Sequence, residues 1–438
     1  NGGDYATEFF DDATAPTFGT SVTVTEASPI AVADAVLGPA AHITGVVTDS
    51  LGTGLEGISV GAGPFDITPG SEFYEHVSWT QTGSGGAFDL GQLPAGTYIL
   101  QFWDESGRYL GEAYDDVRDW PQGTPITLAA GETQALPADV VLADAAFVSG
   151  TVWGEGEAEG LDGISVQAFI DRGDWWEWYS ETGTGPGGIY EIGGLRPGDR
   201  VRLWFDDASG TWGDEGYADA SSWTWADVVV APQDTVDVTL QRAGGIAGYV
   251  YGGDGTDTPL HPATVYGGPW NPDLQEWDAG LIMVGTVDAT GYYEIGGLKP
   301  GVPYRLCADD EGSAYTSGFY DTWGSDPLSA TDIVFASEAT APVDFHLQPG
   351  SSITGTVTNG AAPIEGIPVF LYTPAMDGGW EDFWSSFQGQ QGETDGVGFY
   401  HIDGLSPGEY RVGFGDYTET YAGEFRDDAS MLAMGDTI

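Results

Sequence analysis

The chain of 438 residues is poor in cysteine and in basic residues, and both shortages restrict what it can be. A single cysteine, Cys307, excludes any disulfide within the chain, so packing has to stabilise the fold. Lys and Arg together number 11 against 68 Asp and Glu, which gives a formal net charge of -57. A surface of that charge repels nucleic acid and anionic lipid, so we expect neither as a partner.

Long apolar runs are also missing. No stretch reaches the roughly 18 to 20 apolar residues of a membrane span, and nothing at the start resembles an export signal. The first residue is Asn1 rather than Met. We therefore expect a segment of an extracellular or cell-surface protein whose export signal and any anchor lie outside it. The 41% hydrophobic and 13% aromatic residues are enough to build packed cores, which argues against disorder.

One pattern recurs four times along the chain. An apolar strand carries a glycine near its start, and a Leu-x-x-Gly turn follows each time after a variable stretch. The recurring glycines are Gly45, Gly150, Gly248 and Gly355, at intervals of about 100 residues, the size of one small domain. The repeats predict domains at 41–145, 146–244, 245–350 and 351–438.

Short segments within each repeat alternate apolar and polar residues, and Gly, Pro, Asp and Ser clusters separate them. Residues 98–102 and 236–240 show the alternation clearly. Several short strands in each 100 residues or so, with no convincing helix, are typical of a β-sandwich. The sequence thus predicts an all-β protein, an elongated tandem array of about four Ig-like or prealbumin-like antiparallel β-sandwich domains.

The two ends carry matching fragments of the repeat. An acidic element at 8–12 matches 112–116 and 424–428, so residues 1–40 resemble the tail strands of a preceding repeat. The last repeat stops soon after its own copy and lacks a closing strand equivalent to 22–24 and 32–37. An open sandwich edge is costly, so another segment has to supply the strand. Two interpretations stay open: a longer tandem chain, or a donor strand from the next subunit that gives head-to-tail polymerisation.

The residues at 353–358, 366–369, 398–402 and 404–410 carry a family pattern that recurs in all four repeats. It resembles the carboxypeptidase regulatory-like domain, a prealbumin-like sandwich found in tandem in bacterial surface proteins, and is similar in outline to Cna B-type stalk domains. The resemblance implies a surface protein, but such modules serve as spacers, adhesins and enzyme appendages. Cna B domains often hold a Lys to Asn isopeptide bond. Lys299 is the only lysine and lies in a turn, so this bond is excluded as a general device.

Paired carboxylates near the end of each repeat are candidates for a metal site. Oxygen ligands at a domain junction suit calcium, and a bridging ion would stiffen tandem domains. The alternative is that these residues cap turns and hydrate the surface. The calcium candidates are Asp115, Asp116, Asp427 and Asp428.

Each repeat also carries an aromatic and acidic insertion that would form a contact loop. The rings could pack over an open end of the sandwich, contact other protein in an assembly, or stack on surface glycans. These three interpretations apply to the contact-loop residues Trp175, Trp176, Trp178, Trp270, Trp277, Trp380 and Trp384.

Signals of catalysis are weak. The five histidines have no zinc-type spacing, and no Gly-x-Ser-x-Gly nucleophile motif is present. The sequence predicts a non-enzymatic structural protein that forms an acidic fibre, filament or stalk and whose first partner is itself. The alternatives are a carbohydrate-binding adhesin that uses the Trp loops, and an accessory region of a secreted hydrolase.

Overall fold

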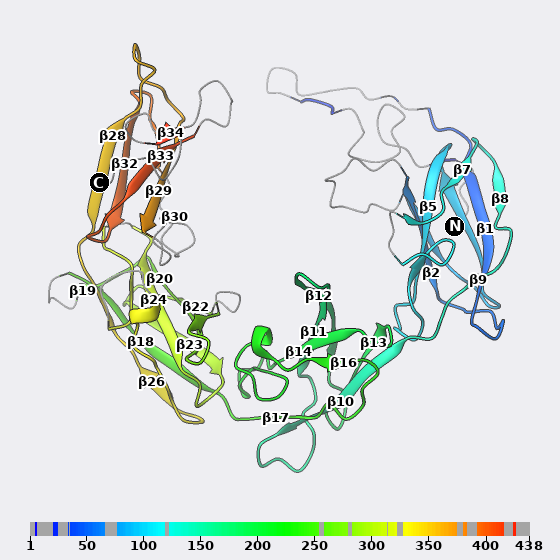
Figure 1. The fold of residues 1–438 in the computed structure, drawn as a ribbon, viewed down its shortest axis with the longest axis horizontal. Coiled ribbons are helices and arrows are strands. Elements are labelled where there is room, and N and C mark those ends of the chain that lie inside the picture. Colours follow the sequence, from blue (N-terminus) through cyan, green and yellow to red (C-terminus); the bar gives the residue numbers. More distant parts are fainter. Residues whose placement is uncertain are drawn as a thin grey trace.

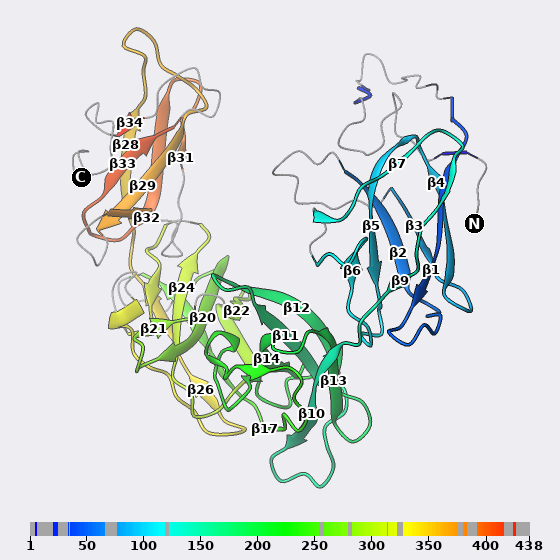
Figure 2. The ribbon, with the colours of Figure 1, turned by 45° about the vertical axis from the view of Figure 1, so that its right-hand side comes forward.

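The structure is a computed structural model that describes residues 5–6, 21–24, 34, 36–65, 77–118, 122–253, 258–278, 283–312, 314–321, 327–374, 380–382, 392–415 and 424–425. These residues form β-sheets, and their helical segments are short 3₁₀ turns that include η3 (Trp223–Trp225) and η4 (Pro327–Ser329). Four two-sheet sandwiches follow one another along an open arc (Figure 1), and a second view shows the same order (Figure 2). The predicted all-β tandem array is confirmed.

The first sandwich packs a sheet around β1 against a sheet around β2. The first sheet has the order β4-β1-β8 with β9 also on β1, and the second has the order β3-β2-β5-β6 with β7 also on β5. The strands are β1 (Ala41–Thr48), β2 (Ser59–Pro64), β3 (Ser78–Gln81), β4 (Ala87–Leu93), β5 (Gly96–Trp103), β6 (Glu112–Ala113), β7 (Ile126–Leu128), β8 (Thr133–Ala135) and β9 (Val140–Val141).

The second sandwich repeats this plan, with sheets β13-β10-β17 and β12-β11-β14-β15, the second of which also holds β16. Its strands are β10 (Ala146–Gly154), β11 (Ser165–Asp171), β12 (Trp176–Gly183), β13 (Ile189–Leu195), β14 (Arg200–Asp206), β15 (Glu215–Gly216), β16 (Val229–Val230) and β17 (Val238–Leu240).

The third sandwich pairs β19, β23, β26 and β27 with β18 in one sheet and has the order β21-β20-β24-β25, with β22 on β20, in the other. Its strands are β18 (Gly244–Gly252), β19 (Thr258–Pro259), β20 (Ala263–Asn271), β21 (Glu276–Trp277), β22 (Met283–Thr286), β23 (Tyr292–Leu298), β24 (Tyr304–Asp310), β25 (Gly318–Phe319), β26 (Thr340–Pro342) and β27 (Phe345–Leu347).

The fourth sandwich has a smaller first sheet. In the described part of the chain β28 pairs with β32 alone, whereas the second sheet keeps the order β30-β29-β33-β34 with β31 on β29. The strands are β28 (Ser351–Thr356), β29 (Pro368–Pro374), β30 (Trp380–Asp382), β31 (Gly392–Glu393), β32 (Phe399–Leu405), β33 (Arg411–Phe414) and β34 (Glu424–Phe425).

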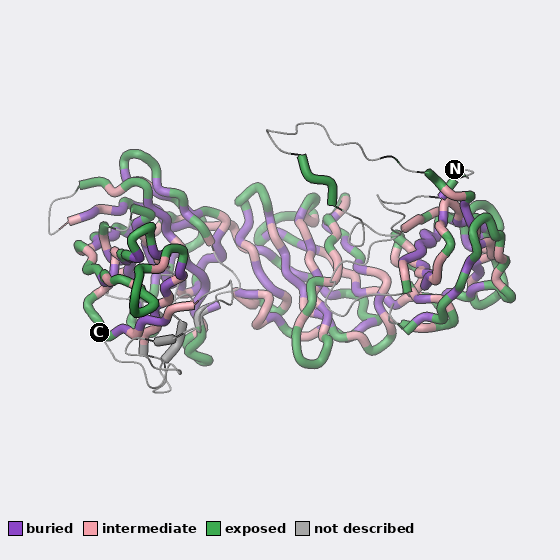
Figure 3. Tube along the Cα trace, turned by 90° about the horizontal axis from the view of Figure 1, so that it is seen from above, coloured by how far each residue is buried: buried purple, intermediate pink, exposed green. Residues whose placement is uncertain are grey.

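Each sandwich buries its own core because its strands alternate. Along β4, β13 and β32 the same sequence of exposed and buried positions recurs, so every second side chain points inward. The inward side chains form four separate clusters, around Phe102, Phe205, Leu306 and Val412. Figure 3 shows buried segments inside each unit and exposed segments outside. The exact domain boundaries stay a prediction.

The pairing of the closing strands differs from an all-antiparallel sandwich. β8 and β9 run parallel to β1, β17 runs parallel to β10, and β26 and β27 run parallel to β18. The chain reaches this position from β7, β16 or their equivalent at the edge of the other sheet. That crossover allows the first and last strands to run in the same direction.

The closing segment explains the recurring glycine in the second and third repeats. A Cβ on Gly150 would lie 2.1 Å from the carbonyl oxygen of Val236, and one on Gly248 would lie 1.8 Å from that of Val343. No side chain fits in that space, so the closing segment can approach the opening strand only beside a glycine.

Candidate functional site

The candidate functional site lies at the joints between consecutive sandwiches. After β5 the backbone turns at Asp104, whose carboxylate accepts hydrogen bonds from the backbone amides of Ser106, Arg108 and Tyr109 at 2.9 to 3.1 Å. Asp207 and Asp310 organise the equivalent turns after β14 and β24. The repeat therefore builds the same turn at the far end of three sandwiches.

This turn holds the linker to the next sandwich. At the first joint, the Leu110 amide donates to the carbonyl of Ala143, and the Ala145 amide donates to that of Arg108, both at 2.8 Å. The same pair of bonds recurs at the second joint, from Gly213 and Ala243 to Gln241 and Thr211, and at the third joint, from Thr316 and Gly350 to Gln348 and Ala314. We call this arrangement the linker clamp. The linker clamp holds the linker backbone in place, so fewer linker residues are free to act as a hinge.

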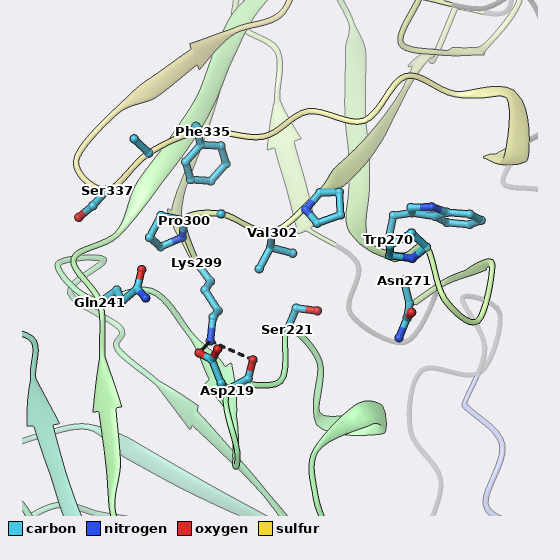
Figure 4. Close-up of a pocket in the computed structure, with 14 residues that line it drawn as sticks. Asp219, Ser221, Gln241, Trp270, Asn271, Lys299, Pro300, Val302, Phe335 and Ser337 are labelled. Carbon is cyan, nitrogen blue, oxygen red and sulfur yellow. Dashed lines mark hydrogen bonds and ion pairs between the residues drawn. The ribbon is translucent and has the colours of Figure 1, made fainter.

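Lys299 lies at the second joint, directly after β23, and reaches from the third sandwich into the second. Its Nζ donates to Oε2 of Glu215 at 2.5 Å. It also donates to the carboxylate of Asp219 and contacts the Asp219 carbonyl at 3.1 Å (Figure 4). The Lys299 and Glu215 side chains are only 5% and 4% exposed. The hydroxyl of Tyr304 donates to the Lys299 carbonyl at 3.1 Å and so holds the turn in place.

In this pair, burial has the largest effect on the pKa of Glu215. Desolvation raises the pKa of Glu215, and the charge and hydrogen bond of Lys299 act in the opposite direction. A lysine with so little contact with water has to find its partners in protein. The backbones of the two sandwiches also lie close together at this joint. A Cβ on Gly213 would lie 2.7 Å from Cα of Lys299.

A second polar contact crosses the same joint. Ser222 and Thr224, at the start of η3, donate their hydroxyls to Oδ2 of Asp278, which follows β21. Ser222 is fully buried and Asp278 is 8% exposed. The second and third sandwiches are therefore joined at two points, and Lys299 and Asp219 of the first contact also line an open cavity.

That cavity has a volume of about 580 Å³ (Figure 4). Its wall in the third sandwich includes Trp270, Val302 and Phe335, and its wall in the second includes Asp219 and Ser221. The Trp270 ring carries the guanidinium of Arg305 at 3.7 Å from its centroid, a cation–π contact that orients the ring.

The first joint has a related arrangement. The Gly194 amide donates to the Gly107 carbonyl at 2.7 Å across the joint. Burial and the charge of Asp116 raise the pKa of Glu112 to about 7, while the charge of Arg196 in the second sandwich lowers it. Arg196 occupies the same place in the Leu-x-Pro-Gly turn as Lys299 does.

The N-terminal segment shows a contrast with its own repeats. Leu37 matches Leu142, Leu240 and Leu347 in the sequence pattern. The three later leucines are at most 4% exposed in or beside their closing strands, whereas Leu37 is 48% exposed. Val22, Val24 and Val36 are also exposed. The apolar side chains of this copy have no core to enter within the described chain.

The calcium candidates lie in a tight turn. Asp115 and Asp116 have φ of 79° and 58°, in the left-handed region, and Asp115 accepts a hydrogen bond from the Thr124 hydroxyl at 2.9 Å. Asp219 and Asp321 occupy the equivalent turns with φ of 68° and 60°. The described residues contain no group of three or more His, Cys, Asp or Glu placed to hold a metal ion. Asp427 and Asp428 lie outside the described residues, and calcium binding stays a prediction.

The aromatic candidates divide into exposed and buried rings. Trp175 and Trp178, on the β11–β12 hairpin, are 61% and 57% exposed. Trp176 is half-buried beneath the Arg202 guanidinium, 4.4 Å from its ring centroid, and Trp270 is 5% exposed. Of Trp277 and Trp380 the structure describes only the backbone, and Trp384 lies outside the described residues.

Sequence reasoning placed Lys299 in its turn but missed its partners. The available signal was that the only lysine falls at the repeat position where Arg196 stands one repeat earlier. Its contact with Glu215 spans two repeats, and no pattern within one repeat predicts it.

Comparisons with known proteins found similarity only among solved structures. No protein-family model matches the chain, and no curated protein matches it. Among solved structures, a streptococcal ancillary pilin is 14% identical, covers 49% of this chain and 73% of its own, and has a TM-score of 0.26. The minor pilin GBS52 of Streptococcus agalactiae is 16% identical over 46% of this chain and 95% of its own, with a TM-score of 0.23. Two B repeat units of the collagen-binding protein of Staphylococcus aureus are 13% identical over 88% of this chain and 95% of their own, with a TM-score of 0.17.

These TM-scores are too low to carry an argument, so the class of protein rests on the strand order of the chain itself. The chain is a tandem array of two-sheet β-sandwich repeats joined by clamped linkers. In the part of the chain that the structure describes, no helix combines the length and apolar character needed to cross a bilayer.

Proposed function

We propose that the chain is a structural, non-enzymatic subunit of an acidic fibre or stalk on a bacterial cell surface, and that it polymerises head to tail by strand complementation. The observation that carries the proposal is the exposure of Leu37 beside the burial of Leu142, Leu240 and Leu347. The four leucines stand at the same spacing before the recurring glycine, and only the first of them is exposed.

The acceptor in this proposal is the fourth sandwich. In the first three sandwiches the opening strand pairs on both edges, with an antiparallel strand on one side and the parallel closing strand on the other. Among the described residues β28 pairs only with β32, which leaves one edge of hydrogen-bonding groups without a strand. Its core, around Ile353, Tyr400 and Val412, lies beneath that edge.

The register follows from the repeats. The segment at 34–37 of one copy would run parallel to β28 of the next, with Leu37 in the place that Leu347 takes beside β18. Backbone hydrogen bonds would supply the pairing, and burial of the apolar side chains would supply most of the free energy. A heterologous contact generates a filament when its rotation does not close into a ring, and the proposal takes this open form.

Filament growth tests the proposal through one matched pair of variants. Light scattering coupled to size exclusion, with negative-stain microscopy, should show filaments for the unaltered chain and short or single species for Leu37→Asp. Leu51→Asp changes an 89% exposed leucine in a turn and should leave filaments unchanged. A synthetic peptide of residues 21–40 should shorten filaments by filling the acceptor edge.

A monomeric unaltered chain that nevertheless binds the peptide would support the other arrangement, in which a longer chain supplies the strand within itself. A chain that stays monomeric and ignores the peptide would contradict complementation in either form.

A second candidate function is glycan adhesion, favoured by the exposure of Trp175 and Trp178 on one hairpin. An indole face stacks on the apolar face of a sugar ring, and nearby carboxylates accept hydrogen bonds from its hydroxyls. A glycan array should give a signal that Trp178→Ala removes, and silence for the unaltered chain would reject this candidate.

A further inference from the structure

The three joints share the linker clamp but differ at two repeat positions that face each other across it. One position is the first residue of the short strand β6, β15 or β25, and the other follows the leucine of the Leu-x-x-Gly turn in the next sandwich. These pairs are Glu112 with Arg196, Glu215 with Lys299, and Gly318 with Ser406.

The first two joints thus carry a carboxylate at one position and a cation at the other, whereas the third joint carries neither a carboxylate nor a cation there. At the second joint the pair is in direct contact at 2.5 Å and is shielded from water. At the first joint the charge of Arg196 acts on Glu112. At the third, glycine and serine offer no charge for such a pair.

From this difference we infer that the buried ion pair locks the second joint, that the Gly194–Gly107 bond and opposite charges hold the first, and that the third joint is where the chain bends. The clamp holds the linker backbone at every joint, so it limits extension but leaves rotation of one sandwich against the next to other contacts. A buried pair resists that rotation, because separating the charges leaves each of them desolvated without its partner.

Two further contacts reinforce the locked joints. Ser222 and Thr224 bind Asp278 at the second joint, and the Gly194 amide binds the Gly107 carbonyl at the first. The third joint, over its described residues, shows the clamp bonds of Thr316 and Gly350 and a close approach of Gly350 to Gly404. The first three sandwiches would therefore move as one rigid body, with the fourth swinging on its end.

The inference extends to the filament, and in this step alone it rests on the proposed function. The joint between two copies would oppose Glu424 of one copy to Pro94 of the next, which has no cation. The filament would then bend on both sides of each fourth sandwich, and rigid segments of three sandwiches would alternate with flexible ones.

Spin-label distance measurements on the full chain test the inference. Labels on the exposed positions 227, 294 and 409 report the second, third and fourth sandwiches. The distance distribution for the 227–294 pair should be narrow and that for the 294–409 pair broad. Equal widths in the unaltered chain would overturn the inference, whatever the variants do.

Substitutions then assign the difference to the ion pair. Lys299→Met should broaden the 227–294 distribution, while Lys299→Arg, which keeps the charge, should leave it closer to that of the unaltered chain. The double substitution Gly318→Glu and Ser406→Lys should install a lock and narrow the 294–409 distribution. An unchanged 227–294 width in a folded Lys299→Met chain would reject the lock. Because monomers suffice for these measurements, their failure is distinguishable from a failure to polymerise.

Discussion

The Nζ of Lys299 lies 2.5 Å from Oε2 of Glu215, and the two residues belong to sandwiches with separate cores. The only lysine of a chain with a net charge of -57 thus forms a contact between two domains and is buried. A lysine in so dry a site needs protein partners for its charge, and the buried partner is Glu215, because the Asp219 side chain is 79% exposed.

We expect Lys299→Met to destabilise the joint by roughly 3–5 kcal/mol, because it leaves the buried Glu215 carboxylate without its counter-charge. Urea unfolding followed by tryptophan fluorescence measures the loss. Lys299→Met combined with Glu215→Gln should recover most of it, since neither charge then remains. A single variant as stable as the unaltered chain would show that the pair contributes nothing.

Leu142 and Leu37 form a second matched pair. Leu142→Ala should cost about 2–5 kcal/mol of stability, because it opens a cavity in the core of the first sandwich. Leu37→Ala should leave the unfolding of the monomer almost unchanged, because half of that side chain is already in water. Thermal unfolding of dilute monomers checks both. An equal loss for the two variants would place Leu37 in a core of its own chain.

Gly248 should not tolerate even a methyl group. Gly248→Ala puts a Cβ into the Val343 carbonyl and should cost roughly 1–3 kcal/mol as β18 and the closing segment move apart. Gly296→Ala, at a strand glycine with nothing within 4 Å of its added Cβ, serves as the control and should be nearly neutral. Similar melting temperatures for the two variants would contradict the close approach.

Acid should stabilise the second sandwich through Asp214. Burial raises the pKa of this carboxyl from 3.8 to about 7, against a smaller effect of the hydrogen bond from the Asp207 amide. Between these two values the folded chain holds a proton that the unfolded chain has lost. This contribution to stability therefore falls as pH rises through the window, and it is lost above about pH 7.

The matched variant is Asp214→Asn, which keeps an oxygen to accept the Asp207 amide and cannot ionise. It should flatten this part of the pH dependence and be more stable than the unaltered chain at pH 8. Melting curves from pH 5 to pH 8 measure both slopes. Parallel slopes would show that Asp214 titrates near its ordinary value when folded.

Much of the fold could be predicted from the sequence because it is local and repeated. Alternation along β4, β13 and β32 identifies strands and inward faces without any knowledge of their partners. The recurrence of Gly45, Gly150, Gly248 and Gly355 predicts four copies of one module. The acidic surface and the lack of disulfides follow from composition alone.

The candidate sites were predictable only in part. The exposure of Trp175 and Trp178 and the burial of Trp270 could not be separated in advance, because all three lie in similar aromatic and acidic stretches. Burial depends on what packs above a ring, and for Trp270 that neighbour includes Arg305 from another strand.

By itself, the sequence determined that this protein is a chain of like β-sandwiches, and it predicts a copy of the closing segment within residues 1–40. Periodicity carries that information, because each repeat has the same alternation of inward and outward residues and buries its own core cluster. Only the tertiary structure decided that closing strands run parallel, that Glu215 meets Lys299 and that Leu37 is left in water. Strand direction depends on how the chain crosses between the sheets, the Glu215–Lys299 contact joins different repeats, and the exposure of Leu37 depends on what packs above it, so none of the three follows from the pattern within one repeat.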